Sequence, residues 1–434
     1  MGIRRWCSAR PRVLFVTRPR FLISNFKIIH PSKSNQMESG IKEKIKTLSE
    51  QYLDETIAVR RHLHMHPELS FHEYETCAYV WDRLDQIGIT QKRKLAKTGI
   101  EALIHGKNPH ARTIALRADM DALPIIEQNQ VPYKSMNDGV MHACGHDAHT
   151  ASLLGAAYIL NSLRDSFEGT IKLIFHPGEE KLPGGASMMI KEGILENPKP
   201  DGVIGQHVMP LIDSGKVGFR SGIYMASTDE IYLKVKGKGG HGAMPHLNVD
   251  PVLIASQILV SLQQIVSRHA NPTMPSVLSF GKFIANGATN VIPNEAYLEG
   301  TFRTLDEKWR TEAHVKIRDM VESIATSMGA TAELEIRKGY PALFNEPELT
   351  AMAKEAAIEY LGTENVVDLD IWMAAEDFAY YSQEASACFY RLGTRNESRG
   401  ITSSVHTPTF DIEEKSLAIG MGLMAWLAVR GLEN

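Results

Sequence analysis

Three apolar segments, each followed by a cluster of polar side chains, constrain the fold of this 434-residue chain most strongly. Their sequences are "TIALRADMDALP" (113–124), "GTIKLIFHPGEE" (169–180) and "DGVIGQHVMP" (201–210). Helical stretches such as "AHTASLLGAAYILNSLR" (148–164) lie between them. Buried strands that alternate with helices predict an α/β sheet. Because chemistry in such sheets gathers beyond the carboxyl ends of the strands, we expect the polar clusters to meet there.

A second pattern interrupts the first near residue 223. Alternating strands and apolar-faced helices follow in the order βαββαβ, which is the split βαβ arrangement of ferredoxin-like domains. The four strand segments are "EIYLKVKGKG", "SVLSFGKFIA", "EAYLEGTFRT" and "TAELEIRKG". We therefore predict an α/β domain made of residues 38–222 and 338–434, with a ferredoxin-like α+β domain inserted at 223–337.

The first 36 residues differ from the rest in charge. They carry eight Lys or Arg and no Asp or Glu, and they are broken by prolines. An organelle transit peptide has this composition; a start assigned upstream of a true start at Met37 would give it too. Residues 1–37 are expected to lie outside the fold. The expected location is the cytoplasm, or an organelle if this segment is a transit peptide.

The composition of the remaining chain argues against several classes of partner and environment. It has 39 basic and 51 acidic residues, a formal net charge of −12, which argues against nucleic acid as a partner. No run of eighteen apolar residues appears, so no membrane span is expected. The four cysteines are widely spaced and do not resemble a disulfide framework, which favours a reducing compartment.

The segment "MHACGHDAHT" (141–150) is dense in metal-binding side chains. A structural zinc site, a reactive thiol, a catalytic metal centre and an inert loop would all fit it. In an extended segment, Cys144 and His146 can point the same way and bind one ion. Thiolate and imidazole together suit zinc and similar divalent ions. Alone, such a pair is weak evidence, because a lone cysteine is more often buried filler.

Glu179 and Glu180 strengthen the metal hypothesis. Two adjacent carboxylates repel each other, which favours a cation beside them, although a solvated acidic loop would look the same. Because neighbouring side chains point differently, one carboxylate can bind a metal while the other moves a proton.

Two further histidines follow predicted strands: His207 in "GQHVMP" and His406 in "SSVHTPTF". With them there are five candidate ligands, and five ligands plus a shared group suit two metals. A structural zinc site would favour paired cysteines, and no CxxC occurs. A Cys144 nucleophile paired with histidine would leave the two glutamates unexplained.

The ordered motifs of residues 38–434 resemble the M20 family of metallo-aminoacylases and metallocarboxypeptidases. The resemblance is greatest to its amidohydrolase branch of hippurate hydrolases, N-acyl-amino-acid amidohydrolases and plant auxin-conjugate hydrolases. It rests on "RRHLHMHPELSFHEYET", "LRADMDALPI", "MHACGHDAHTASLLGAA", "FHPGEE", "GGASMMIKEG", "GQHVMP", "GKGGHGAMPH", "NVIPNEAYLEGTFRT", "AAEDFAYY" and "VHTPTF". It implies a catalytic three-layer α/β domain, an inserted lid or dimerisation domain, and a homodimer or homotetramer.

The resemblance also implies roles for individual residues. Five match the family's ligands of two divalent metal ions: Cys144, His146, Glu180, His207 and His406. Glu179 matches the general base. His241 matches a residue that reaches the active site of a neighbouring subunit and stabilises the oxyanion. Asn290 and Arg303 match lid positions that contact the substrate carboxylate, a group that arginine can hold with two parallel hydrogen bonds.

One departure from the wider family concerns the metal. Other branches place a His-x-Asp ligand motif where this chain has Asp119-Met120-Asp121. Cys144 is expected to replace that ligand. A thiolate favours softer ions, so zinc, manganese and cobalt are all candidates.

The expected reaction is metal-dependent hydrolysis of the amide bond of N-acyl amino acids, with Glu179 as the general base. A dipeptidase or carboxypeptidase is the alternative, because the same machinery cleaves either bond, and the substrate is a small molecule or short peptide in each case. A catalytically dead metal-binding protein is a third reading, against which the Glu179 beside a full ligand set argues.

Overall fold

The computed structural model describes residues 33–433, and the compact body of the chain begins at Ile41. Most of the predicted N-terminal extension, residues 1–37, lies outside the described residues and stays a prediction.

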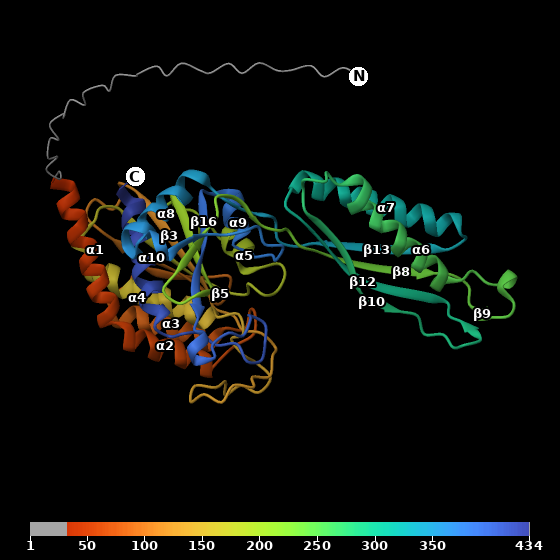
Figure 1. Ribbon diagram of the computed structural model, residues 1–434, viewed down its shortest axis with the longest axis horizontal. Helices are drawn as coiled ribbons and strands as arrows, with labels where there is room; N and C mark the ends of the chain where they lie inside the picture. The colour runs from red at the N-terminus through yellow and green to blue at the C-terminus, as the bar shows by residue number, and fades with distance from the viewer. Residues whose placement is uncertain (1–32, 434) are drawn as a thin grey trace, which may run out of the picture. The chain divides into compact units, whose positions relative to one another are not determined.

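The main sheet has eight strands in the order β1-β2-β4-β3-β5-β16-β6-β15. β3 pairs in parallel with β4 and β5, and β5 pairs in parallel with β16. The carboxyl ends of these strands therefore meet at one edge of the sheet (Figure 1). The strands are β1 (Lys92–Leu95), β2 (Gly99–His105), β3 (Thr113–Asp119), β4 (Thr170–His176), β5 (Gly202–Asp213), β6 (Val217–Phe219), β15 (Val366–Asp368) and β16 (Ala387–Arg395).

Helices cover both faces of this sheet, as predicted for a three-layer α/β domain. Alternate residues of β3 and β4 enter different cores: Leu116 and Leu173 pack with α2, α3, α4, α8 and α10, while Ala115 and Ile174 pack with α5 and α9. Strands buried on both faces explain the continuous apolar segments in the sequence. The helices are α1 (Lys33–Gln51), α2 (Leu53–Met65), α3 (Tyr74–Gln86), α4 (His146–Ser162), α5 (Gly185–Lys191), α8 (Pro347–Leu361), α9 (Ala379–Glu384) and α10 (Ser416–Glu433).

Among the described helices, α10 alone has the length and composition of a membrane span. However, 78% of it is buried inside the protein, and it packs against α4 and α8. These contacts are those of a core helix.

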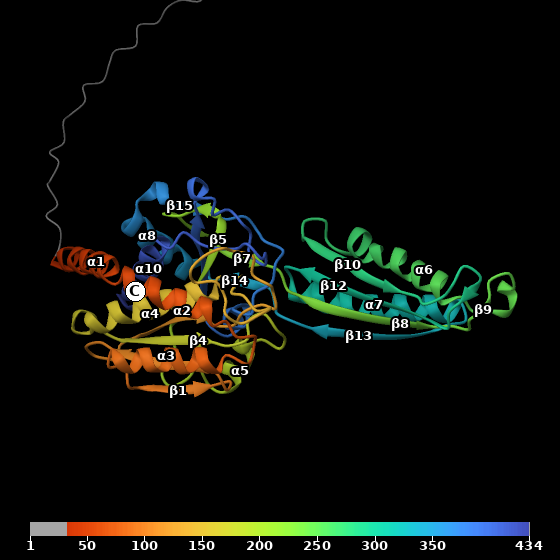
Figure 2. The ribbon, with the colours of Figure 1, turned by 90° about the horizontal axis from the view of Figure 1, so that it is seen from below.

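The inserted segment forms a separate four-stranded antiparallel sheet in the order β10-β12-β8-β13. In chain order this is second, third, first and fourth, as in the split βαβ arrangement, so the ferredoxin-like prediction is confirmed. Its helices α6 and α7 pack on one face of the sheet (Figure 2). The elements are β8 (Asp229–Lys236), α6 (Pro251–Gln264), β10 (Ser276–Ile284), β12 (Glu295–Thr304), α7 (Glu307–Ser327) and β13 (Thr331–Lys338).

Local sequence explains where the two inserted helices begin. Asp250 accepts the backbone N–H groups of Val252 and Leu253, and Pro251 occupies the first turn of α6. Asp306 accepts the N–H of Trp309 at the start of α7. Both helices thus have a capped N-terminus at the residue where the apolar pattern starts.

Short elements that the sequence pattern did not predict complete the structure. β9 (Gly240–His241) pairs with β11 (Val291–Ile292), and β7 (Gly222–Met225) pairs with β14 (Leu343–Asn345). The remaining single-turn helices are η1 (Arg164–Ser166), η2 (Pro245–Leu247), η3 (Ile265–His269), η4 (Thr363–Asn365) and η5 (Glu397–Arg399). The domain boundaries at 223 and 337 stay a prediction.

Candidate metal centre

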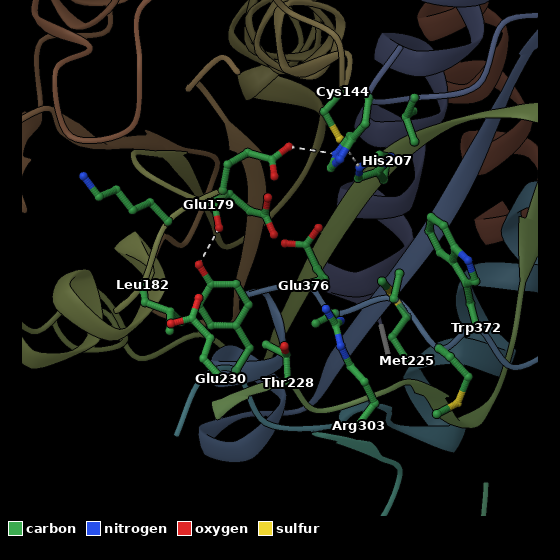
Figure 3. Close-up of a pocket in the computed structure, with 18 of the residues that line it drawn as sticks. Cys144, Glu179, Leu182, His207, Met225, Thr228, Glu230, Arg303, Trp372 and Glu376 are labelled. Atoms are coloured by element: carbon green, nitrogen blue, oxygen red, sulfur yellow. Dashed lines mark hydrogen bonds and ion pairs between the residues drawn. The ribbon is translucent and has the colours of Figure 1, made fainter. Parts of the chain in front are cut away.

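The five predicted metal ligands come from different elements that end at the same edge of the main sheet. Cys144 lies in the loop before α4, and His146 is the first residue of α4. Glu180 follows β4, His207 belongs to β5, and His406 lies in the loop after β16. Figure 3 shows Cys144, His207 and Glu179 on one side of a shared pocket. The parallel pairing of β3, β4 and β5 thus brings together residues that are far apart in the sequence.

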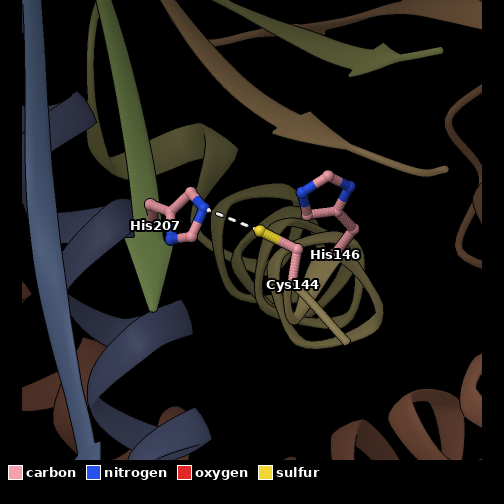
Figure 4. Close-up of side chains that lie close together, drawn as sticks. All are labelled: Cys144, His146 and His207. Atoms are coloured by element: carbon pink, nitrogen blue, oxygen red, sulfur yellow. Dashed lines mark hydrogen bonds between the residues drawn. The ribbon is translucent and has the colours of Figure 1, made fainter. Parts of the chain in front are cut away.

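Cys144, His146 and His207 form a group in which all three side chains are buried, with their donor atoms within 4.8 Å of one another (Figure 4). The Cys144 Sγ lies 3.4 Å from the His207 Nε2. The His207 Nδ1 donates to its neighbour's carbonyl oxygen at 2.7 Å, so the Nε2 carries the free lone pair. The His146 Nε2 is buried and has no hydrogen-bond partner. Because buried polar atoms are rarely left unpaired, this arrangement fits a bound cation.

Glu180 and His406 extend the group. Cys144, Glu180 and His406 also place one donor atom each within 4.8 Å of one another, and so do His146, Glu179 and Glu180. The His406 Nε2 lies 3.1 Å from a Glu180 carboxylate oxygen. His406 has a φ of +62°, a strained region for a side chain other than glycine, and its backbone N–H donates to Ala143 at 2.7 Å. Overlapping groups that share Cys144 and Glu180 suit two neighbouring ions.

The electrostatics of Cys144 argue against a free nucleophilic thiol. Burial, together with the charges of Glu180 and Glu179, raises the pKa of Cys144. A thiolate is therefore disfavoured unless a cation compensates it. The geometry fits a metal thiolate better than a Cys–His nucleophile.

Asp121 fixes the positions of His146 and of the loop that carries Glu179 and Glu180. Its carboxylate accepts the Ser70 hydroxyl at 2.6 Å and the backbone N–H groups of Glu179 and Glu180 at 3.0 and 2.9 Å. It also lies 3.2 Å from the His146 Nδ1, which leaves Nε2 to face the other ligands. Asp121 therefore supports the ligands, as carboxylates behind metal-binding histidines do.

His149 connects Asp119 to the backbone of Val208, the residue that follows the candidate ligand His207. Its Nδ1 lies 2.6 Å from Asp119, and its Nε2 accepts the backbone N–H of Val208 at 2.8 Å. Both ring nitrogens are occupied, which excludes His149 as a ligand in this arrangement.

Glu179 is buried beside the candidate ligands. Burial raises its pKa, and so do the charges of Glu376, Glu180 and Asp377. Its backbone carbonyl accepts the Tyr340 hydroxyl at 2.6 Å, and a carboxylate oxygen accepts the Asp377 N–H at 3.3 Å. Its high proton affinity and fixed position suit a group that accepts a proton.

Sequence reasoning gave no role to the carboxylates of "AAEDFAYY". Glu376 and Asp377 both accept Arg117 at 2.9 Å, and Arg117 also binds Asp119 at 2.5 Å. This buried network packs against Glu179 and holds the Asp377 backbone N–H that donates to its carboxylate. Two signals pointed to it: a second pair of adjacent carboxylates, as in "HPGEE", and a charged residue inside the apolar strand "TIALRAD".

A cavity of about 1130 Å³ opens in front of these residues. Cys144, Glu179 and His207 line one side of it, and Arg303 on β12 lines the other (Figure 3). The predicted carboxylate-binding arginine thus faces the candidate metal centre. The cavity can hold a molecule the size of an acylated amino acid.

His241 and Asn290 lie elsewhere. The β9–β11 pair places them side by side, since the Gly242 N–H donates to the Asn290 carbonyl at 2.8 Å. Both are exposed, and neither lines the cavity of its own chain. The structure therefore does not bring them to the site within one subunit.

Comparison with known proteins agrees with the fold and identifies the family. Residues 115–430 match the model of Peptidase family M20/M25/M40. The chain is 43% identical to the N-acyl-L-amino acid amidohydrolase of Geobacillus stearothermophilus, over 71% of this chain and 82% of that one. It is 38% identical to thermostable carboxypeptidase 2 of Saccharolobus solfataricus, over 89% and 98%.

Among solved structures, a dinuclear metal-binding M20 peptidase from Bacillus subtilis matches with a TM-score of 0.76 and 35% identity. The match covers 88% of this chain and 99% of that one. These findings together show that the chain belongs to peptidase family M20/M25/M40 and is an amidohydrolase of that family.

Proposed function

We propose that this chain hydrolyses the amide bond of N-acyl amino acids, using two divalent metal ions held by Cys144, His146, Glu180, His207 and His406. The observation that carries the proposal is the buried, unpartnered His146 Nε2 among these donors, next to the buried carboxylate of Glu179. Similarity to an N-acyl-L-amino acid amidohydrolase and to a dinuclear metal-binding peptidase supports it. Zinc, manganese and cobalt all suit a mixed thiolate, imidazole and carboxylate set.

When bound, the ions supply a water of lowered pKa and polarise the scissile carbonyl. Glu179 accepts the proton of the attacking water and passes it to the leaving amine. Arg303 holds the α-carboxylate of the substrate from the opposite wall, where a guanidinium can form two parallel hydrogen bonds. The buried wall of Arg117, Glu376 and Asp377 keeps Glu179 in position for both transfers.

We also propose that the chain works as a homodimer, in which His241 and Asn290 of one subunit reach the cavity of the other. Both are exposed and outside their own cavity. The inserted domain also exposes apolar side chains that a partner could cover: Leu253 and Val260 on α6 are 60% and 65% exposed, and Phe283 and Ile284 lie on the edge strand β10. His241 would then stabilise the oxyanion that forms on the substrate.

The carboxypeptidase relative favours cleavage of a peptide bond as a second candidate. A panel of N-acetyl amino acids, N-benzoylglycine, free dipeptides and N-blocked dipeptides separates the two functions. We expect kcat/KM for an N-acyl amino acid to exceed that for the matching dipeptide by roughly tenfold or more, a difference of about 1.4 kcal/mol in transition-state binding. Faster hydrolysis of dipeptides would replace the first function with the second.

A further inference from the structure

Arg391 is a buried cation in the wall of the cavity. It lies on β16, directly beside His207 of β5 in the parallel register. Its side chain is fully buried, and it lines the cavity together with Met225 and Trp372. Figure 3 shows Met225 and Trp372 side by side on this part of the wall. A positive charge therefore stands next to the candidate metal centre, on the main-sheet side.

The hydrogen bonds of Arg391 are incomplete. Its Nε donates to the Tyr224 hydroxyl at 2.6 Å, and its Nη2 lies 3.0 Å from the Met225 sulfur. Its Nη1 is buried and has no hydrogen-bond partner. The rings of Tyr224, Trp372 and Phe389 surround the guanidinium, with centroids 5.3, 5.0 and 4.9 Å from its Cζ. These rings orient the group but leave its charge without a counter-ion.

The other fully buried arginines are different. Arg117 contacts Asp119, Glu376 and Asp377, Arg60 contacts Asp147, and Arg310 contacts Asp229. Among the side chains that the structure describes, those of residues 40–433, no carboxylate forms an ion pair with Arg391. A buried charge without a partner is costly, and a guanidinium prefers the planar fork of a carboxylate. Because Arg391 lines a cavity, a ligand can supply that carboxylate.

Five cations line the cavity: Lys181, Arg303, Arg337, Lys338 and Arg391. Lys181, Arg337 and Lys338 are exposed at its rim, and the last two pair with Glu335 and Glu307. The two cations that are at least half-buried lie on two walls. Arg303 approaches from the inserted domain and Arg391 from the main sheet. If Arg303 holds the α-carboxylate, Arg391 is the remaining buried cation of the cavity, and its unpartnered Nη1 suits a second anionic group. The aromatic rings around Arg391 would exclude water from that contact and so strengthen it.

We propose that Arg391 binds a second carboxylate of the substrate, so that the preferred substrates are N-acyl amino acids with two negative charges. This inference rests on the proposed function. The second carboxylate has two sources: the far end of a dicarboxylic acyl group, or the side chain of an acidic amino acid. Both present the same planar group to the Arg391 Nη1.

The test compares kcat/KM for three substrates: N-acetyl-L-methionine, N-succinyl-L-methionine and N-acetyl-L-glutamate. In the wild type we expect one of the two dianionic substrates to exceed N-acetyl-L-methionine by roughly tenfold or more. Arg391→Met, which keeps an apolar stem among the rings, should remove that preference, and Arg391→Lys should restore part of it. The substrate that loses its advantage identifies the source of the carboxylate.

Arg303→Met is the matched control, and it should weaken all three substrates by a similar factor. Equal losses on all three substrates in Arg391→Met would overturn the proposal, as would the absence of any preference in the wild type. If Arg391→Met does not fold, product inhibition of the wild type decides the matter. Succinate should then inhibit at roughly tenfold lower concentration than propionate, or glutamate than glutamine; equal inhibition within both pairs would overturn the proposal.

These outcomes are distinguishable from failure of the proposed function. Hydrolysis of N-acetyl-L-methionine without a dianion preference would remove the role of Arg391 alone. No hydrolysis of any substrate in the panel would count against the proposed function itself.

Discussion

Glu179→Gln is expected to lower kcat by roughly two to four orders of magnitude while the bound metal content stays unchanged. The amide keeps the shape of the side chain but cannot accept a proton at neutral pH. The position of the loop should survive, because Asp121 holds it through the backbone N–H groups of Glu179 and Glu180. The measurement is steady-state hydrolysis of an N-acyl amino acid, with metal analysis of the same preparation.

Glu180→Gln is the matched control at the neighbouring position. Its carboxylate lies 3.1 Å from the His406 Nε2 and shares a donor group with Cys144 and His406, whereas Glu179 shares a group with neither. Loss of the Glu180 carboxylate should therefore reduce the metal content as well as the turnover. Comparing the two variants therefore distinguishes a residue that carries a proton from a residue that binds the metal. Near-normal turnover in Glu179→Gln, or the same metal loss in both variants, would remove Glu179 from the role of general base.

Mixed dimers of His241→Ala and Glu179→Gln are expected to recover activity that neither variant has alone. In a mixed dimer, the site with an intact Glu179 receives His241 from the Glu179→Gln subunit. Random pairing of equal amounts makes half of the dimers mixed, with one working site each, so about a quarter of the wild-type activity should return. The measurement is the hydrolysis rate after co-expression of the two variants with different tags.

The control for this experiment is a mixture of His241→Ala with the double variant, in which no subunit offers His241. It should recover nothing. If mixed dimers are isolated by their two tags and still lack activity, His241 does not act across a subunit interface. Full activity of His241→Ala by itself would exclude any role in catalysis.

The sequence predicted the parts of the fold that depend on local pattern. β12 (Glu295–Thr304) covers the residues of the predicted strand "EAYLEGTFRT", because alternating side chains at a half-buried surface mark its ends. The ligand-bearing segments were predicted for a related reason: buried parallel strands read as apolar runs, and the polar residues that follow them stand out. Short strands such as β6 and β15 give no such signal, because three residues are too few to show a period.

The side chains that surround the candidate ligands could not be predicted from the sequence pattern, because their contacts join residues that are far apart in the chain. Arg117 meets Glu376 across 259 positions, and no spacing rule connects them. The Arg391 environment is set in the same way by β5, β7 and β16 together. For His241 the difficulty is reversed. The family resemblance predicts its role, but the structure of a single chain places it outside the cavity.

The most direct test of the proposed metal-dependent amidohydrolase is a metal titration of the chelated wild-type chain, followed by the hydrolysis of an N-acyl amino acid. Turnover should be absent without metal and should rise with added zinc, manganese or cobalt until two ions are bound per chain. Equal turnover before chelation, after chelation and after metal addition would contradict the assignment of Cys144, His146, Glu180, His207 and His406 as the ligands of a catalytic centre.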